Sequence, residues 1–390
     1  MDNRKLALAK HKEWQGKIEV SSRVTITSPE DLGLAYTPGV AEACRVIEKD
    51  PEKVYELTRK GSLVGVITNG TAVLGLGDIG PAAAMPVMEG KCVLFKEFGG
   101  VDAFPICLNA KDPATVIQTV EQIAGSFGGI NLEDIAAPAC FEIERELKKR
   151  LSIPVFHDDQ HGTAVVVAAG LINALKLVGK SFDSIKVVIN GAGSAGIAVA
   201  KHLINFGVKN LILTDKEGIL TGGTKNLNIE QQKIAQVTNP NHYQGDLFKA
   251  LENADVFIGV SAPDVLTQPM IKHMNDGPII FAMANPEPEI MPDLAKKAGA
   301  AVVGTGRSDF PNQINNVSAF PGIFKGALSI RATTINEEMK VAASYAIAEL
   351  VQQSELTADF VIPDALDPRV APAVAKAVCQ AAIDSGVVRN

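Results

Sequence analysis

Residues 186–215 read KVVINGAGSAGIAVAKHLINFGVKNLILTD, and this stretch decides the fold of the second half of the chain. An apolar, β-branched run at 186–190 predicts a buried strand, and glycines in GxGxxG spacing follow it at once. The first glycine permits a tight turn, the second lets a pyrophosphate approach the backbone, and the third lets the next helix pack on the strand. We therefore predict a β-turn-α-β unit that binds a dinucleotide at the start of its helix. The residues expected to line this loop are Gly191, Ala192, Gly193, Ser194, Ala195 and Gly196.

The acid at the end of this stretch predicts which dinucleotide is bound. A second strand at 210–214 leads to Asp215, where a carboxylate can accept hydrogen bonds from the ribose of the adenosine. The same charge would repel a 2′-phosphate, so we expect NAD to be favoured over NADP. Lys216 and Lys225 follow and could pair with such a phosphate, so the use of both cofactors stays open.

Length and composition limit what the chain can be. Because 390 residues exceed one ordinary core, we predict two α/β domains: an N-terminal domain at 1–160 and a doubly wound, Rossmann-type domain with C-terminal helices at 161–390. A net charge of −7 argues against a nucleic acid or a membrane surface as partner. Five cysteines without paired spacing, no apolar stretch of 18 residues and no leader pattern predict a cytoplasmic protein.

Two apolar runs in the first half end in acidic residues. Glu133 and Asp134 end one run, Asp158 and Asp159 end the next, and a helical pattern lies between them. Parallel strands separated by a helix present their carboxyl ends at one edge of a sheet, so these four carboxylates are expected to converge. The cluster would repel itself without a cation, and oxygen donors suit Mg²⁺ or Mn²⁺ better than zinc. Helix caps and exposed turns are the alternative explanation for these acids.

Other candidates stand in turns and at strand ends. Lys91 is expected to open a strand beside two glycine-rich turns, and Tyr36 lies in an exposed turn before a helix. Asn285 and the pair Asn315 and Asn316 are expected near the nicotinamide edge of the second sheet, where they can hold substrate oxygens, although asparagine before proline also suits a plain turn. Residues 330–351 are expected to form one long helix.

Eight segments, in this order and spacing, resemble the malic enzymes, and in particular their short bacterial type. They are AYTPGVAEAC, TNGTAVLGLGDIG, EGKCVLFKEFGGVDAFPI, INLEDI, FHDDQHGTA, GAGSAGIA, MANPEPEI and NNVSAFPG. The resemblance covers nearly the whole chain. It implies a homodimer or higher homo-oligomer that oxidises and decarboxylates L-malate to pyruvate and CO₂ with NAD or NADP and Mg²⁺ or Mn²⁺.

The resemblance also implies a role for each matching residue. Tyr36 would be the acid, Lys91 the base, and Asp158 a neighbour that positions or tunes the base. The implied metal ligands are Glu133, Asp134 and Asp159. The implied substrate contacts are Lys91, Asn285 and Asn316. The implied cofactor contacts are the glycine loop, Asp215 and Asn285.

These residue types fit the chemistry of a 2-hydroxy acid. A base removes the hydroxyl proton, a metal polarises the resulting ketone, and an acid protonates C3 after CO₂ leaves. We expect the nearby cation to lower the pKa of Lys91 toward neutrality. One departure concerns the substrate: larger malic enzymes have an arginine for the C4 carboxylate where this chain has Ala72, so another basic side chain, from this chain or from a partner subunit, is needed.

Three alternatives stand beside this interpretation. A malolactic enzyme shares these motifs but releases lactate and keeps its NAD bound. An amino-acid dehydrogenase also combines a lysine with a Rossmann-type domain, yet it has no use for a carboxylate metal site. A nucleotide sensor without catalysis would require Lys91, Tyr36 and the acids all to be incidental.

Overall fold

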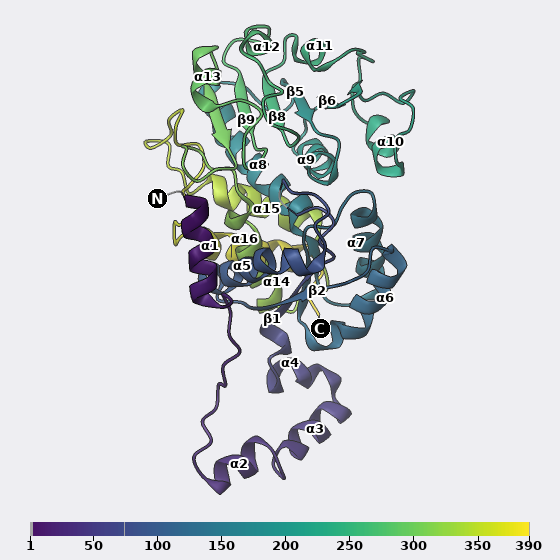
Figure 1. The fold of residues 1–390 in the computed structure, drawn as a ribbon, viewed down its shortest axis with the longest axis vertical. Helices are drawn as coiled ribbons and strands as arrows, with labels where there is room; N and C mark the ends of the chain where they lie inside the picture. Colours follow the sequence, from purple (N-terminus) through teal and green to yellow (C-terminus); the bar gives the residue numbers. More distant parts are fainter. Residues whose placement is uncertain (1–2, 74, 390) are drawn as a thin grey trace.

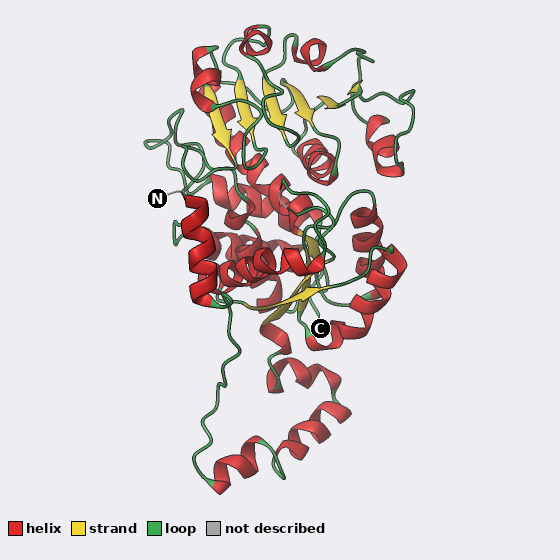
Figure 2. Ribbon diagram, viewed as in Figure 1, coloured by secondary structure: helices red, strands yellow, loops and turns green. Residues whose placement is uncertain are grey.

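The computed structural model describes residues 3–73 and 75–389, which contain two parallel sheets surrounded by helices (Figure 1; Figure 2). The first sheet has the order β2-β1-β3-β4, and all of its pairings are parallel. Its strands are β1 (Leu63–Thr68), β2 (Asp102–Cys107), β3 (Gly129–Leu132) and β4 (Val155–His157). The helices between them are α5 (Pro81–Gly99), α6 (Pro113–Ile123) and α7 (Ala139–Arg150).

The second sheet has the order β10-β9-β8-β5-β6-β7, with only β7 antiparallel to its neighbour. Strands β6 and β8 lie on opposite sides of β5, so the topological switch point of a doubly wound fold follows β5. The strands are β5 (Lys186–Asn190), β6 (Asn210–Asp215), β7 (Gly218–Ile219), β8 (Val256–Gly259), β9 (Ile279–Ala282) and β10 (Val302–Thr305). The helices are α9 (Ser194–Asn205), α10 (Ile229–Ala235), α11 (Leu247–Leu251), α12 (Gln268–Lys272) and α13 (Pro292–Lys297). The predicted α/β class with a Rossmann-type second half is confirmed.

Helix α8 (Asp158–Val178) joins the two sheets and packs against α9. It is long and apolar enough to cross a membrane, but 72% of its apolar window is buried inside the protein, as in a core helix. The predicted domain boundary at residue 160 falls in its first turn. The two-domain architecture agrees with the prediction, and this exact boundary stays a prediction.

The last helices of the chain return to the first sheet. These helices are α14 (Phe320–Ser329), α15 (Glu337–Ala348) and α16 (Val370–Asp384). Helix α14 packs on α5, where the ring of Phe95 lies 4.7 Å from that of Phe320 and 5.2 Å from that of Phe324, centroid to centroid. Residues more than 200 positions apart therefore share one hydrophobic core.

The N-terminal region leaves the body of the protein. Helix α1 (Asn3–Trp14) lies beside the body, whereas α2 (Pro29–Ala35) and α3 (Val40–Lys49) project from it at the lower end of the view, before α4 (Val54–Leu57) returns the chain (Figure 1). We call residues 20–57 the arm. A capping box starts α2, with Asp31 N donating to Ser28 Oγ and Ser28 N donating to Asp31 Oδ2, both at 3.0 Å. None of the residues of α2 and α3, all of which the structure describes, is buried.

Two predicted elements are wrong. Lys91 opens no strand but lies within α5, a helix that starts with Pro81 and ends before Gly100 in a left-handed conformation. The expected helix over 330–351 spans only Glu337–Ala348, because Asn336 caps its start by accepting from Met339 N at 3.0 Å.

Candidate active site

The four acids of the first half meet at the end of the first sheet, as predicted. Strands β3 and β4 are neighbours in parallel register, with Leu132 opposite His157, so the residues that follow them emerge side by side. Glu133, Asp134 and Asp159 each offer a carboxylate oxygen, and these oxygens lie within 4.8 Å of one another. Asp134 N also donates to Asp159 Oδ2 at 2.8 Å, which fixes the two segments together.

The backbone at Asp134 is strained in a way that serves this cluster. Its φ of +53° lies in the left-handed region, which non-glycine residues seldom adopt, and Ala72 N donates to its carbonyl oxygen at 3.0 Å. Such strain costs about 1–3 kcal/mol and is often found at functional sites. The left-handed conformation of Asp134 turns the chain after β3, so the side chains of Glu133 and Asp134 both lie at the carboxyl end of the first sheet.

Lys91 lies among these acids on the buried face of α5. Its Nζ donates to Asp158 Oδ2 at 2.6 Å and pairs with Glu133 Oε1 at 2.9 Å, and only 7% of the residue is exposed. Burial alone would lower the pKa of Lys91, but the carboxylates of Asp158 and Glu133 together raise it above the usual range. The expected lowering toward neutrality concerns the site with a cation bound, and it stays a prediction.

The cluster has the properties of a divalent cation site. Burial raises the pKa of Glu133, Asp158 and Asp159, which means that their charges are costly in this environment. Lys91 supplies one positive charge against four carboxylates, so two further positive charges would stabilise the ionised acids. Since all the donors are carboxylate oxygens, the residues present fit Mg²⁺ or Mn²⁺, with Glu133, Asp134 and Asp159 as the ligands.

The glycine loop after β5 has the shape that a pyrophosphate requires. Gly191 has φ +116°, and a Cβ there would lie 2.5 Å from Val260 O. A Cβ on Gly196 would lie 1.8 Å from Gly191 O, so the helix can approach the strand only because this residue is glycine. No heavy atom of the described residues lies within 4 Å of a Cβ built on Gly193, which leaves that side of the loop open.

Asp215 ends β6 beside this loop, as expected. Its Oδ1 accepts from Glu217 N at 2.8 Å, which holds the carboxylate at the start of the β6–β7 turn. Ser194 and Ala195 belong to the first turn of α9 and line the same cavity as Lys91 and the acids. The cofactor loop and the acidic cluster therefore open into one space.

This cavity has a volume of about 800 Å³ and lies between the two sheets. Asn285 and Asn316 line it together with Lys91, Glu133, Asp134 and Asp159, so the structure brings the two predicted substrate contacts to the predicted metal site. Asn315 lines the cavity as well and caps a short turn, accepting from Val317 N at 3.0 Å.

Two functional candidates were missed by the sequence prediction. Lys17 lines the cavity, where its Nζ donates to Pro86 O at 2.5 Å and its backbone N donates to Glu89 Oε2 at 3.1 Å. Glu289 is fully buried behind the cavity and accepts from Ser261 N at 2.9 Å and from Ala284 N at 3.0 Å, which ties the ends of β8 and β9 together. Glu289 could have been found as the second acid of the segment MANPEPEI, which follows a predicted strand. No feature of the sequence around Lys17 marks it as a functional residue.

Tyr36 is not brought to this cavity within the chain. It is the C-cap of α2, on the arm, with 68% of its surface exposed, and the arm points away from α5 (Figure 1). Apolar side chains on the arm are exposed in the same way; they are Val20, Val24, Ile26, Leu32, Leu34, Val40, Val46 and Leu57.

Known proteins resemble this chain in sequence and in fold. Residues 15–148 match the malic enzyme N-terminal domain, and residues 160–383 match the malic enzyme NAD binding domain. The chain is 60% identical to the bifunctional malic/malolactic enzyme of Bacillus subtilis, over 100% of this chain and 95% of that protein. It is 56% identical to the NAD-dependent malic enzyme of Geobacillus stearothermophilus, over 96% of this chain and 78% of that protein. The crystal structure of malic enzyme from Pyrococcus horikoshii superposes with a TM-score of 0.94 at 48% identity, covering 98% of this chain and 92% of that one. Because the two matched domains span most of its length, the chain belongs to the malic enzyme family.

Proposed function

We propose that this protein oxidises and decarboxylates L-malate to pyruvate and CO₂ with reduction of NAD(P)⁺. One observation carries the proposal: a single cavity joins Lys91, a three-carboxylate cation site and the first turn after the dinucleotide loop. The nicotinamide supplies the oxidant, and a divalent cation held by Glu133, Asp134 and Asp159 supplies Lewis acidity toward the 2-hydroxy acid.

Lys91 is the proposed base for the hydroxyl proton of malate. It must be neutral to act, and Asp158 Oδ2, at 2.6 Å from its Nζ, is the group that can take the proton from it. Burial raises the pKa of Asp158, which makes that carboxylate a better proton acceptor. A cation held by Glu133 would weaken the pairing of that carboxylate with Lys91, and this pairing is one of the interactions that raise the pKa of Lys91.

Tyr36 is the proposed acid, and it acts in the cavity of a second copy of the chain. The arm carries Tyr36 away from its own Lys91 and exposes eight large apolar side chains that a monomer leaves in water. A two-fold dimer in which each arm covers the partner's body would bury these side chains and complete both sites. The proposal is therefore a homodimer, or a higher oligomer built from it.

Lys17 is the proposed contact for the C4 carboxylate, the role left open by Ala72. Apart from Lys91, it is the lysine among the described residues that line the cavity. Replacing Lys17 with methionine is expected to raise KM for malate about tenfold or more and to change kcat little, since a hydrogen bond to a charged group contributes about 1.5–3 kcal/mol. Lys12→Met, on the exposed face of α1, is the matched control. An unchanged KM in Lys17→Met would assign the carboxylate to another residue.

NAD is the proposed preferred cofactor because Asp215 ends β6 beside the glycine loop. The named relatives include both NAD-dependent and NADP-dependent malic enzymes, so both cofactors are to be compared. A cytoplasmic location is proposed as well, in line with five free cysteines among the described residues.

Production of lactate is the second candidate, because one relative is named a bifunctional malic/malolactic enzyme. The deciding experiment incubates the protein with L-malate, NAD⁺ and Mn²⁺ and measures NADH, pyruvate and lactate together. Equal amounts of NADH and pyruvate are expected. Formation of lactate without NADH would contradict the proposal and identify malolactic activity. If no malate is consumed with or without Mn²⁺, the alternative of a nucleotide sensor without catalysis is supported instead.

A further inference from the structure

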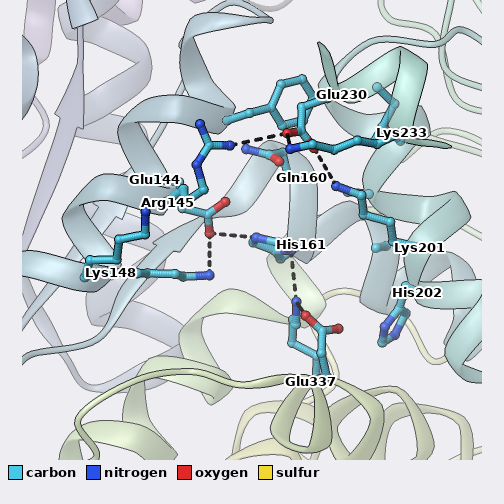
Figure 3. A pocket seen from close by; sticks show the side chains of 16 residues that line it. Glu144, Arg145, Lys148, Gln160, His161, Lys201, His202, Glu230, Lys233 and Glu337 are labelled. Atoms are coloured by element: carbon cyan, nitrogen blue, oxygen red, sulfur yellow. Dashed lines mark hydrogen bonds and ion pairs between the residues drawn. The ribbon is translucent and has the colours of Figure 1, made fainter. Parts of the chain in front are cut away.

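A second cavity, of about 450 Å³, lies on the other side of the first turn of α8 from the active site. Helices α7 and α8 form one side of it, and α9, α10 and α15 form the other, so it lies between the two sheets (Figure 3). Its charged lining holds six cationic side chains against three carboxylates. The cations are Arg145, Lys148, Lys149, Lys201, Lys233 and Lys340, and the carboxylates are Glu144, Glu230 and Glu337.

The ion pairs in this cavity leave most of the N–H donors unused. Arg145, Lys201 and Lys233, from three helices, all converge on the buried carboxylate of Glu230, at 3.3, 2.9 and 2.7 Å (Figure 3). An ammonium carries three N–H donors and a guanidinium carries five, so one carboxylate cannot satisfy this group. Lys149 pairs with Glu146, outside the lining, and the remaining donors of the half-exposed Arg145, Lys201 and Lys233 are open to solvent and to a ligand in the cavity.

A buried amide points to a ligand as a separate observation. Gln160 is 3% exposed and lines the cavity, and its Nε2 has no hydrogen-bond partner among the described residues. Because an unsatisfied buried donor costs about 1–3 kcal/mol, a rotation of this amide toward an acceptor bound in the cavity would recover free energy.

We infer that this cavity binds a small organic dianion, a phosphate ester or a dicarboxylate, that regulates the enzyme. The two negative charges of such a ligand suit a cavity with more cationic than anionic side chains. Phe141, Ile197 and Ala198 form an apolar wall for the carbon part of the ligand. Gln160 and His161 directly follow Asp158 and Asp159 in α8, so a ligand held by Gln160 would bear on the active site through one helical turn. Regulation rests on the proposed malate oxidation, whereas binding does not.

Binding is tested by isothermal titration calorimetry of the full chain at constant ionic strength, with inorganic phosphate, glycerol 3-phosphate and succinate as probes. The double variant Arg145→Gln with Lys233→Gln is expected to bind the best probe at least tenfold more weakly than the wild type does. Both side chains are about half exposed, at 47% and 56%, so the variant should fold. The control Lys296→Gln also loses one exposed ion pair, to Asp359, and should bind like the wild type.

Several results would overturn the inference. The first is that the wild type shows no saturable binding of any probe. The second is that the double variant binds the best probe less than threefold more weakly than the wild type does. A third is loss of probe binding when NAD⁺ is saturating, which would make the cavity part of the cofactor site. Stronger binding of glycerol 3-phosphate identifies a phosphate ester as the ligand class, and stronger binding of succinate identifies a dicarboxylate. Regulation is then measured as a change of at least threefold in KM for malate that the double variant lacks.

Discussion

At the scale of single residues, the acids of the active site divide into cation ligands and a partner of Lys91. Asp134→Asn or Asp159→Asn is expected to weaken Mn²⁺ binding at least tenfold and to abolish malate turnover, because each removes one of the three clustered carboxylates. Asp158→Asn should keep near-normal Mn²⁺ affinity while losing turnover, because Asp158 pairs with Lys91 instead. Mn²⁺ titration by electron paramagnetic resonance checks both. Asp112→Asn, at an exposed helix cap, is the control, and wild-type Mn²⁺ affinity in the first two variants would contradict the ligand assignment.

Asp215 carries the prediction for cofactor choice. We expect kcat/KM to favour NAD⁺ over NADP⁺ about tenfold, or roughly 1.4 kcal/mol, because the carboxylate repels a 2′-phosphate. Asp215→Ala should shift the ratio toward NADP⁺, whereas Glu217→Ala, at an exposed neighbouring position, should not. A wild-type preference for NADP⁺ would mean that Lys216 and Lys225 determine the choice.

At the scale of elements, α14 completes the core of the first sheet. Phe324 is fully buried against Phe95 and Phe156, so Phe324→Ala is expected to lower the free energy of unfolding by about 3–5 kcal/mol. Ile383→Ala, at a half-exposed position on α16, should change it by less than about 0.5 kcal/mol. Denaturant unfolding followed by circular dichroism gives both values. Similar small changes in the two variants would mean that α14 adds little to this core.

Local patterns predicted the elements that depend on neighbouring residues. The dinucleotide unit was predicted because its strand, glycines and helix are adjacent in sequence, and the acids were predicted to converge because β3 and β4 pair directly. A helix of small residues was expected to follow the glycine-rich turn at its start, but the second half of α5 was missed, because Gly90 and Pro86 lower its helix propensity and burial against β1 and β2 overrides that preference. Lys17 was missed because its contact with Glu89 joins segments 72 residues apart.

At the scale of the whole molecule, the arm predicts that each active site needs two chains. Tyr36→Phe and Lys91→Ala homodimers should each be nearly inactive. Mixing the two variants under conditions of subunit exchange should restore about a quarter of wild-type activity, since half of the dimers would be mixed and each would hold one complete site. Mixing Lys91→Ala with Asp134→Asn is the control and should restore no activity, because Lys91 and Asp134 belong to the cavity of the same chain, so each cavity of a mixed dimer keeps one defect. No recovery in the mixture of Tyr36→Phe and Lys91→Ala, despite proven exchange, would contradict action of Tyr36 on the partner.

The packing of Phe320 and Phe324 on Phe95 has a consequence for synthesis of the protein. Strands β1 to β4 and α5 leave the ribosome more than 150 residues before α14 does, so the nascent first sheet waits with one apolar side uncovered. The second sheet, whose strands are contiguous in sequence, can close the core on one of its faces during that interval. We therefore expect folding during translation to run against chain order, with the dinucleotide-binding half maturing first and the metal-binding half sealed by the last residues made.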